Sequence, residues 1–164
     1  MLIEISHDLE LPLNDVHRAA IEIAKAAENR TPPYDAVTLA VNLRNLRTPL
    51  EGEIRIPVEI QLEPPAKMSG DFHVEIRASS NEALFPRFEG TLSLTPEGEA
   101  GTRLWLRGEY VPPMGFLGSA VDATALHGVG ERSLTNFLDW IASDISTRVI
   151  AIESKVRRTR DFNR

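Results

Sequence analysis

The chain has 164 residues, no cysteine, 42% hydrophobic and 26% charged residues, and a formal net charge of −6. This composition predicts one globular domain and excludes a disordered chain, a low-complexity fibre and a disulfide-stapled domain. Because cysteine is absent, thiol nucleophiles and cysteine-ligated metal centres are also excluded. We find neither a signal peptide nor a run of about 18 apolar residues, so the sequence predicts a cytoplasmic protein without a membrane span.

Charge is distributed unevenly along the chain. From Thr147 onward there are six basic and two acidic residues, so this end carries a net +4 and the remainder a net −10. An acidic body argues against nucleic-acid binding, which depends on basic contacts to phosphate. Two interpretations of the basic end stay open. It is either a solvated helix end whose cations complement the helix dipole, or a segment that meets an anionic partner or membrane surface.

Alternation of apolar and polar residues with a period of two predicts six strands, and the short loops between them indicate an antiparallel meander. The strands are expected over residues 3–11, 37–43, 54–62, 72–78, 88–94 and 104–110. Pro57 cannot donate to a strand ladder, so we expect an edge or a bulge at that point. Gly90 and Gly108 share the inward parity, which indicates strong curvature or close approach there.

Two helices are predicted, a short one after the first strand and a long one at the C-terminal end. The long helix carries an apolar stripe that must face the sheet, made of Leu134, Leu138, Ile141, Ile145, Val149, Ile152 and Val156. Extended toward its start near Asp122, the stripe reaches His127 and Glu131, which would then line a hydrated cavity or pair with each other. Alternatively, the helix begins after Gly130 and His127 lies in a solvated loop.

A more specific pattern joins the last two strands to the long helix. The segments Phe88–Leu92 and Leu104–Val111 lead into Pro112-Pro113-Met114-Gly115, with Leu117-Gly118 and Asp122 following. This run, and the order strand, helix, meander, long helix, resemble the helix-grip fold of the START and polyketide-cyclase (SRPBCC) superfamily, in particular its uncharacterised bacterial members. The resemblance implies an α+β fold in which a curved antiparallel sheet of six to seven strands wraps around the C-terminal helix. We expect one domain over residues 1–156 and a mobile basic tail over 157–164.

Most catalytic and metal-binding patterns are absent from the sequence. None of the four histidines is paired at metal-ligand spacing, and there is no Walker loop, dinucleotide fingerprint or G-x-S-x-G motif. We therefore expect no metal and no cofactor. The superfamily has no universal catalytic residues, so the resemblance does not by itself assign a function.

The leading hypothesis is a non-enzymatic protein that binds a mainly apolar small molecule, such as a lipid, an isoprenoid or a polycyclic aromatic compound, between the sheet and the C-terminal helix. The residues expected to line this cavity are His7, Tyr110, Met114, Phe116, His127, Glu131 and Leu134. One alternative is an enzyme of the cyclase, dehydratase or hydrolase type that uses the polar members of this set for proton transfer. Another is a protein-interaction module that uses the outer sheet face and the basic tail.

Each polar candidate also has a purely structural interpretation. His7 is then a hydrogen-bonded core histidine, Tyr110 a sheet residue whose hydroxyl reaches solvent, and His127 with Glu131 an ordinary pair on a helix surface. Trp105 has the opposite parity from Leu104 and Leu106, which places it on the outer face of the sheet.

Overall fold

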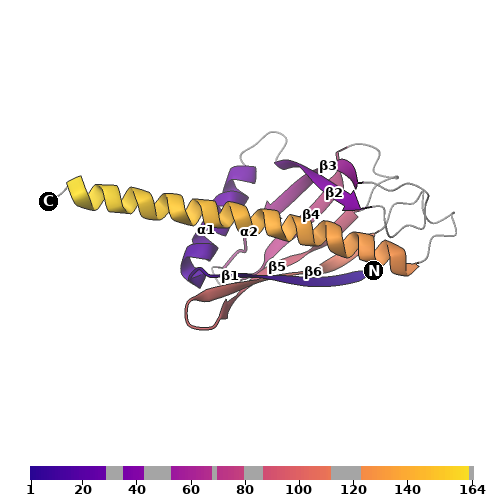
Figure 1. The fold of residues 1–164 in the computed structure, drawn as a ribbon, viewed down its shortest axis with the longest axis horizontal. Coiled ribbons are helices and arrows are strands. Elements are labelled where there is room, and N and C mark those ends of the chain that lie inside the picture. Colours follow the sequence, from indigo (N-terminus) through magenta and orange to yellow (C-terminus); the bar gives the residue numbers. More distant parts are fainter. Residues whose placement is uncertain (29–34, 43–52, 68–69, 80–86, 112–122, 163–164) are drawn as a thin grey trace.

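The computed structural model describes residues 1–28, 35–42, 53–67, 70–79, 87–111 and 123–162. Residues 44–51, which the sequence leaves unassigned, lie outside them. The elements in chain order are β1 (Leu2–Leu9), α1 (Leu13–Glu28), β2 (Asp35–Asn42), β3 (Glu53–Glu63), β4 (Phe72–Ala78), β5 (Arg87–Glu97), β6 (Gly101–Val111) and α2 (Ala123–Phe162) (Figure 1).

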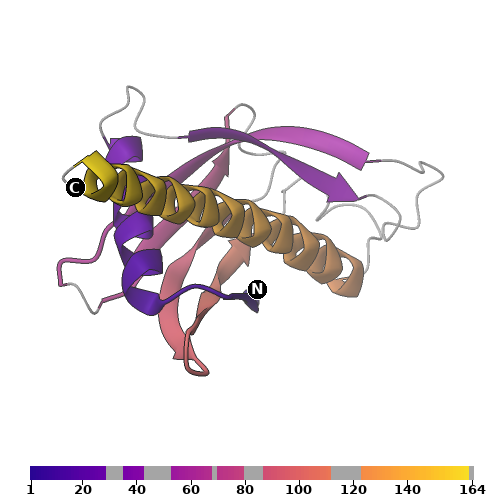
Figure 2. The same cartoon turned by 60° about the vertical axis from the view of Figure 1, so that its left-hand side comes forward.

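The six strands form one antiparallel sheet in the order β1-β6-β5-β4-β3-β2. The sheet curves around α2, and this helix packs against the two edge strands, β1 and β2 (Figure 2). It makes few close approaches to the middle strands β3, β4 and β5, so side chains rather than backbone fill the space between them. This arrangement confirms the predicted α+β helix-grip architecture.

Pro57 lies in a part of β3 that pairs with β2 but not with β4. Pro57 lies opposite Thr38 of β2, whereas the pairing of β3 with β4 begins one residue later, at Val58 opposite Ala78. The missing N–H of proline therefore costs no bond to β4 in the described register. The local edge predicted from the sequence is confirmed.

The two inward glycines face each other across β5 and β6. Gly90 pairs with Gly108, and a Cβ on Gly108 would lie 2.3 Å from the carbonyl oxygen of Glu89 and 2.7 Å from the Cζ atom of Phe88. The Phe88 ring thus occupies the space that two side chains would otherwise take. The expectation of a close approach at these glycines is confirmed.

At one end of the sheet, α1 closes the concave face. Its residues Val16, Ala19, Ala20, Ile23 and Ala24 are all buried. They belong to the same core as Phe72 and Leu92 of the sheet and Phe137 and Ile145 of α2. Small residues at steps of three and four on this face let α1 pack closely against the sheet.

The helix α2 begins at Ala123, so the alternative in which it starts after Gly130 is wrong. It continues to Phe162, six residues beyond the domain boundary predicted at residue 156. Val149 is its last buried residue in the described part, and the segment that follows projects away from the sheet past α1 (Figure 1). The mobility of residues 157–164 stays a prediction. Within the described residues, neither helix combines the length and the apolar character that a membrane crossing needs.

Candidate functional site

Tyr110 and Gly130 meet at the end of the fold opposite α1. Tyr110 lies on the inner face of β6 and is 3% exposed. A Cβ on Gly130 would lie 2.8 Å from Cε1 of the Tyr110 ring and 3.0 Å from Cδ1 of Ile3. Glycine at this position of α2 therefore lets the aromatic ring pack directly on the helix. The tyrosine ring and Ile3 occupy the space beside this glycine.

The hydroxyl of Tyr110 stays protonated over the whole physiological range. Burial disfavours the phenolate and raises the pKa of Tyr110 to about 12. The group can therefore donate a hydrogen bond and cannot act as a base at neutral pH. Leu134, another residue predicted to line the cavity, is buried one helical turn after Gly130.

His7 lies at the rim of the fold rather than inside it. Its Nδ1 is 2.8 Å from Oδ1 of Asp139 on α2, and the two side chains are 34% and 54% exposed. A carboxylate only accepts hydrogen bonds, so Nδ1 carries the proton in this pair. The inward placement expected for His7 is wrong because β1 is an edge strand, where a side chain of inward parity meets the flank of α2. That His7 contributes to ligand binding stays a prediction.

Glu131 is exposed, and the expectation that it continues the apolar stripe of α2 is also wrong. Gly130, four residues before Leu134, is buried, whereas Glu131, three residues before it, is exposed. The buried positions advance by nearly four residues a step along α2, so the buried face turns as the helix crosses the curved sheet. The side chain of His127 and the residues Met114 and Phe116 lie outside the described part of the chain.

The interior offers few polar groups to a ligand or a reaction. Besides Tyr110, the buried polar side chains of the described residues are Thr102 and Ser133. Thr102 donates its hydroxyl proton to the carbonyl oxygen of Leu11 at 2.7 Å, at the end covered by α1. His7 and Glu131 therefore do not come together with Tyr110 in the interior as the proton-transfer group that the sequence suggested. Within the described chain, no His, Asp or Glu cluster suited to a metal ion occurs.

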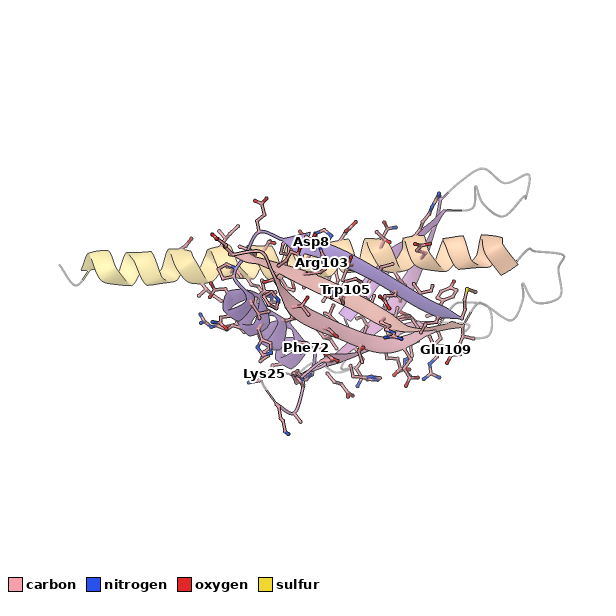
Figure 3. All side chains as sticks on the ribbon, turned by 90° about the horizontal axis from the view of Figure 1, so that it is seen from below. Asp8, Lys25, Phe72, Arg103, Trp105 and Glu109 are labelled. Atoms are coloured by element: carbon pink, nitrogen blue, oxygen red, sulfur yellow. The ribbon has the colours of Figure 1, made fainter. Side chains whose placement is uncertain are left out.

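The outer sheet face is covered by ion pairs between neighbouring strands. Arg103 donates to both carboxylate oxygens of Asp8, at 2.6 and 2.9 Å, and lies 3.1 Å from Glu97 (Figure 3). The hydrogen bond from Arg103 lowers the pKa of Asp8. The guanidinium also lies 5.9 Å from the ring centre of Trp105, which confirms that this tryptophan is on the outer face. These contacts hold β1 to β6, so the charged side chains on the outer face have a structural role.

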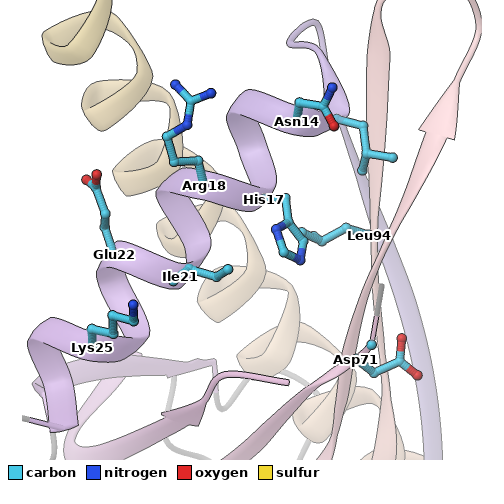
Figure 4. A pocket seen from close by; sticks show the side chains of 10 residues that line it. Asn14, His17, Arg18, Ile21, Glu22, Lys25, Asp71 and Leu94 are labelled. Carbon is cyan, nitrogen blue, oxygen red and sulfur yellow. The ribbon is translucent and has the colours of Figure 1, made fainter. Parts of the chain in front are cut away.

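Sequence reasoning missed a groove of about 670 Å³ on the outside of α1 (Figure 4). One wall is α1 itself, and the other is formed by Gly70 and Asp71 before β4 and by Leu94 on β5. The available signal was the row His17, Ile21 and Lys25, spaced by four on a face of α1 that differs from the buried one. Nothing in the sequence indicated that residues 70, 71 and 94 would lie beside this row.

No protein-family model and no curated protein sequence matches the chain. Among solved structures, a conserved protein from Geobacillus kaustophilus is similar at 15% identity, with a TM-score of 0.55, over 90% of this chain and 96% of that one. The Zhui aromatase/cyclase from Streptomyces sp. R1128 gives 15% identity and a TM-score of 0.49, over 91% and 95% of the two chains. The protein Ara h 8.0201 gives 11% and 0.48, over 92% and 98%.

The Geobacillus structure shares the fold over nearly the full length of both chains. The chain thus has an α+β helix-grip fold, as the sequence predicted. Identities this low carry no information on substrate or activity. Function must be argued from the chain's own residues.

Proposed function

We propose that the protein binds a mainly apolar small molecule between the sheet and the first turns of α2, around Tyr110, Gly130 and Leu134. One observation carries the proposal. A mainly apolar concave face is covered by α1 at one end, whereas at the other end the described helix that lies against Tyr110 is α2, through Gly130. Ligand sites in proteins are typically apolar cavities with one or two polar groups that orient the ligand.

Tyr110 supplies the polar group in this proposal. Because its hydroxyl stays neutral and its ring rests on Gly130, it would donate a hydrogen bond to an oxygen of an otherwise apolar ligand. We include Met114, Phe116 and His127 in the proposed lining because the described chain stops at Val111 and resumes at Ala123 at this end. Lipids, isoprenoids and polycyclic aromatic compounds all meet these requirements.

The test compares naphthalene with its hydroxylated analogue naphthol, titrated into the full-length protein and followed by amide NMR shifts. We expect saturable binding of both, with dissociation constants below about 100 µM. Tyr110→Phe keeps the ring and removes the hydroxyl. It should weaken naphthol binding by about threefold to tenfold and leave naphthalene binding unchanged.

Thr102→Val is the matched control, since Thr102 is the buried hydroxyl at the other end of the inner face of β6. It should lower stability without altering either affinity. The proposal is wrong if neither probe binds saturably, or if the shifts map away from Tyr110, Gly130 and Leu134.

A further inference from the structure

Two neighbouring inner positions of the sheet carry no side chain. Gly90 on β5 and Gly108 on β6 face each other, and a Cβ on Gly90 would lie 2.3 Å from the carbonyl oxygen of Arg107. The two strands therefore approach too closely at this point for a side chain on either glycine. Because neighbouring strands lie about 4.8 Å apart, this bare patch, formed by the backbone of Gly90 and Gly108, is about 10 Å wide across the strands.

A single ring covers the bare patch. For both glycines, the nearest side-chain atom to the position of a Cβ is Cζ of Phe88, at 2.7 Å. Phe88 is 2% exposed, and it lies opposite Tyr110 in the register of β5 and β6. Opposite residues on one face of a sheet have Cβ atoms about 5 Å apart, so the two aromatic side chains are neighbours on the inner face. The covered patch thus adjoins the residue around which we place the ligand.

The strands on either side of the patch carry buried aliphatic side chains. Ile3 of β1 lies opposite Gly108, and Val74 of β4 lies opposite Gly90. Ile3 also lies against α2, since its Cδ1 is 3.0 Å from the position of a Cβ on Gly130. Between these two aliphatic residues, the depth of the concave face on the sheet side depends on the ring of Phe88.

We infer that Phe88 determines the size of the ligand that the interior site accepts, an inference that rests on the proposed function. With its ring over Gly90 and Gly108, the space for a ligand ends beside Tyr110. Without the ring, a flat ligand can extend over bare backbone, where no other side chain stands in its way. Since the ring that is lost and the ring that is gained are of similar size, removing the Phe88 ring should admit about one further fused ring.

The test compares naphthol with phenanthrol, which has one more fused ring, titrated into the full-length protein and into Phe88→Ala and followed by amide NMR shifts. Phenanthrol is the more apolar of the two probes, so the measured quantity is the change between proteins in the ratio of phenanthrol affinity to naphthol affinity. This ratio should rise by about tenfold in Phe88→Ala, because only the variant buries the additional ring.

Milder variants provide the matched control. Phe88→Leu removes part of the ring volume and should raise the ratio by about threefold. Phe72→Leu makes the same change at a buried phenylalanine of β4 that lies under α1, and it should leave the ratio unchanged. A general loosening of the core would change the ratio in both variants. If Phe88→Ala does not fold, the comparison of the two leucine variants decides.

A double variant locates the added volume. Adding Tyr110→Phe to Phe88→Ala should weaken phenanthrol binding by about threefold to tenfold, because the hydroxyl of Tyr110 still bonds to the ligand oxygen in the enlarged site. Phenanthrol bound in a separate cavity would not depend on this hydroxyl.

The inference is overturned, and the proposed function stands, if naphthol binds beside Tyr110 and the ratio is the same in the wild-type protein and both Phe88 variants. It is also overturned if Phe72→Leu changes the ratio as much as Phe88→Leu, or if phenanthrol binds Phe88→Ala equally well with and without Tyr110→Phe. Failure of naphthol to bind the wild-type protein saturably overturns the proposed function and the inference together.

Discussion

The two ends of the concave face are built from the same kinds of residue and are closed in different ways. At the α1 end, a helix with a face of alanines and branched residues lies over Phe72, and the buried hydroxyl of Thr102 is bonded to the carbonyl oxygen of Leu11. At the other end, Tyr110 and Phe88 lie over glycines, on α2 and on the sheet. One end is closed by a separate element and the other by aromatic rings.

This difference shows how a single sheet can have a rigid end and an adaptable one. An element such as α1 is held by many contacts at once, so opening that end requires most of them to be lost together. An aromatic ring on a glycine is held by its own packing alone and can move by rotation of the side chain. We therefore expect stability to reside at the α1 end and ligand response at the Tyr110 end.

The largest expected effect compares Phe72→Ala with Phe88→Ala. Phe72→Ala should lower the free energy of unfolding by about 3–5 kcal/mol, because its site under α1 cannot collapse around the cavity. Phe88→Ala should cost at least about 1 kcal/mol less, since its neighbours at the Tyr110 end can rearrange. Urea denaturation of both variants measures the difference. Equal losses would mean that the two ends are equally rigid.

Gly108→Ala should cost about 3 kcal/mol, because the new Cβ meets the backbone of β5 at Glu89 and Gly90 and not only a movable ring. Adding Phe88→Ala should not restore stability. The control is Gly98→Ala in the β5–β6 turn, where φ is 61° and no atom lies within 4 Å of the new Cβ. That change should cost only about 1 kcal/mol, from the left-handed backbone. Rescue of Gly108→Ala by Phe88→Ala would show that the ring alone keeps these strands apart.

The Tyr110 end should also respond to alkaline pH. Folding raises the pKa of Tyr110 from about 10 to about 12, so its contribution to stability is complete below pH 10 and is lost as pH rises toward 12. By pH 11 the loss should reach about 1.4 kcal/mol. Since lysines titrate in the same range, the measured quantity is the difference between the wild-type protein and Tyr110→Phe. If this difference is flat from pH 9 to pH 11, the hydroxyl is solvated and the end is already open.

The smallest expected effect lies beyond the α1 end, where α2 leaves the body. Deleting residues 157–164 should change stability by less than about 0.5 kcal/mol, because exposed charges contribute little individually. Thermal unfolding of the full and shortened chains measures this. A loss of several degrees in melting temperature would show that the projecting end of α2 packs against the body or a second copy, and the domain boundary at residue 156 would have to move.

Strand parity predicted most of the fold, because alternation in a strand depends on local sequence alone. It placed Trp105 outside and Tyr110 inside, and it marked Gly90 and Gly108 as a close approach. Parity does not say what lies above a side chain, which is why His7 was expected in the interior although β1 is an edge strand. The prediction that Glu131 continues the apolar stripe was wrong for a related reason. It assumed a straight stripe, whereas the buried face of α2 turns along the helix. The groove beside α1 was out of reach because it joins residues about 50 to 80 positions apart in the sequence.

The pairing of β1 with β6 has a consequence for how the chain folds. The strands β2 to β6 follow one another and can pair as successive hairpins, but β1 joins a strand that lies about 100 residues later. During synthesis β1 therefore emerges long before β6, and until then both of its edges are free. Glu4, His7 and Asp8 put charged or polar groups along this strand, which discourages pairing with strands of other nascent chains. When β6 arrives, Arg103 and Arg107 bind Asp8 and Glu4, so the residues that protect the waiting strand also select its partner and register.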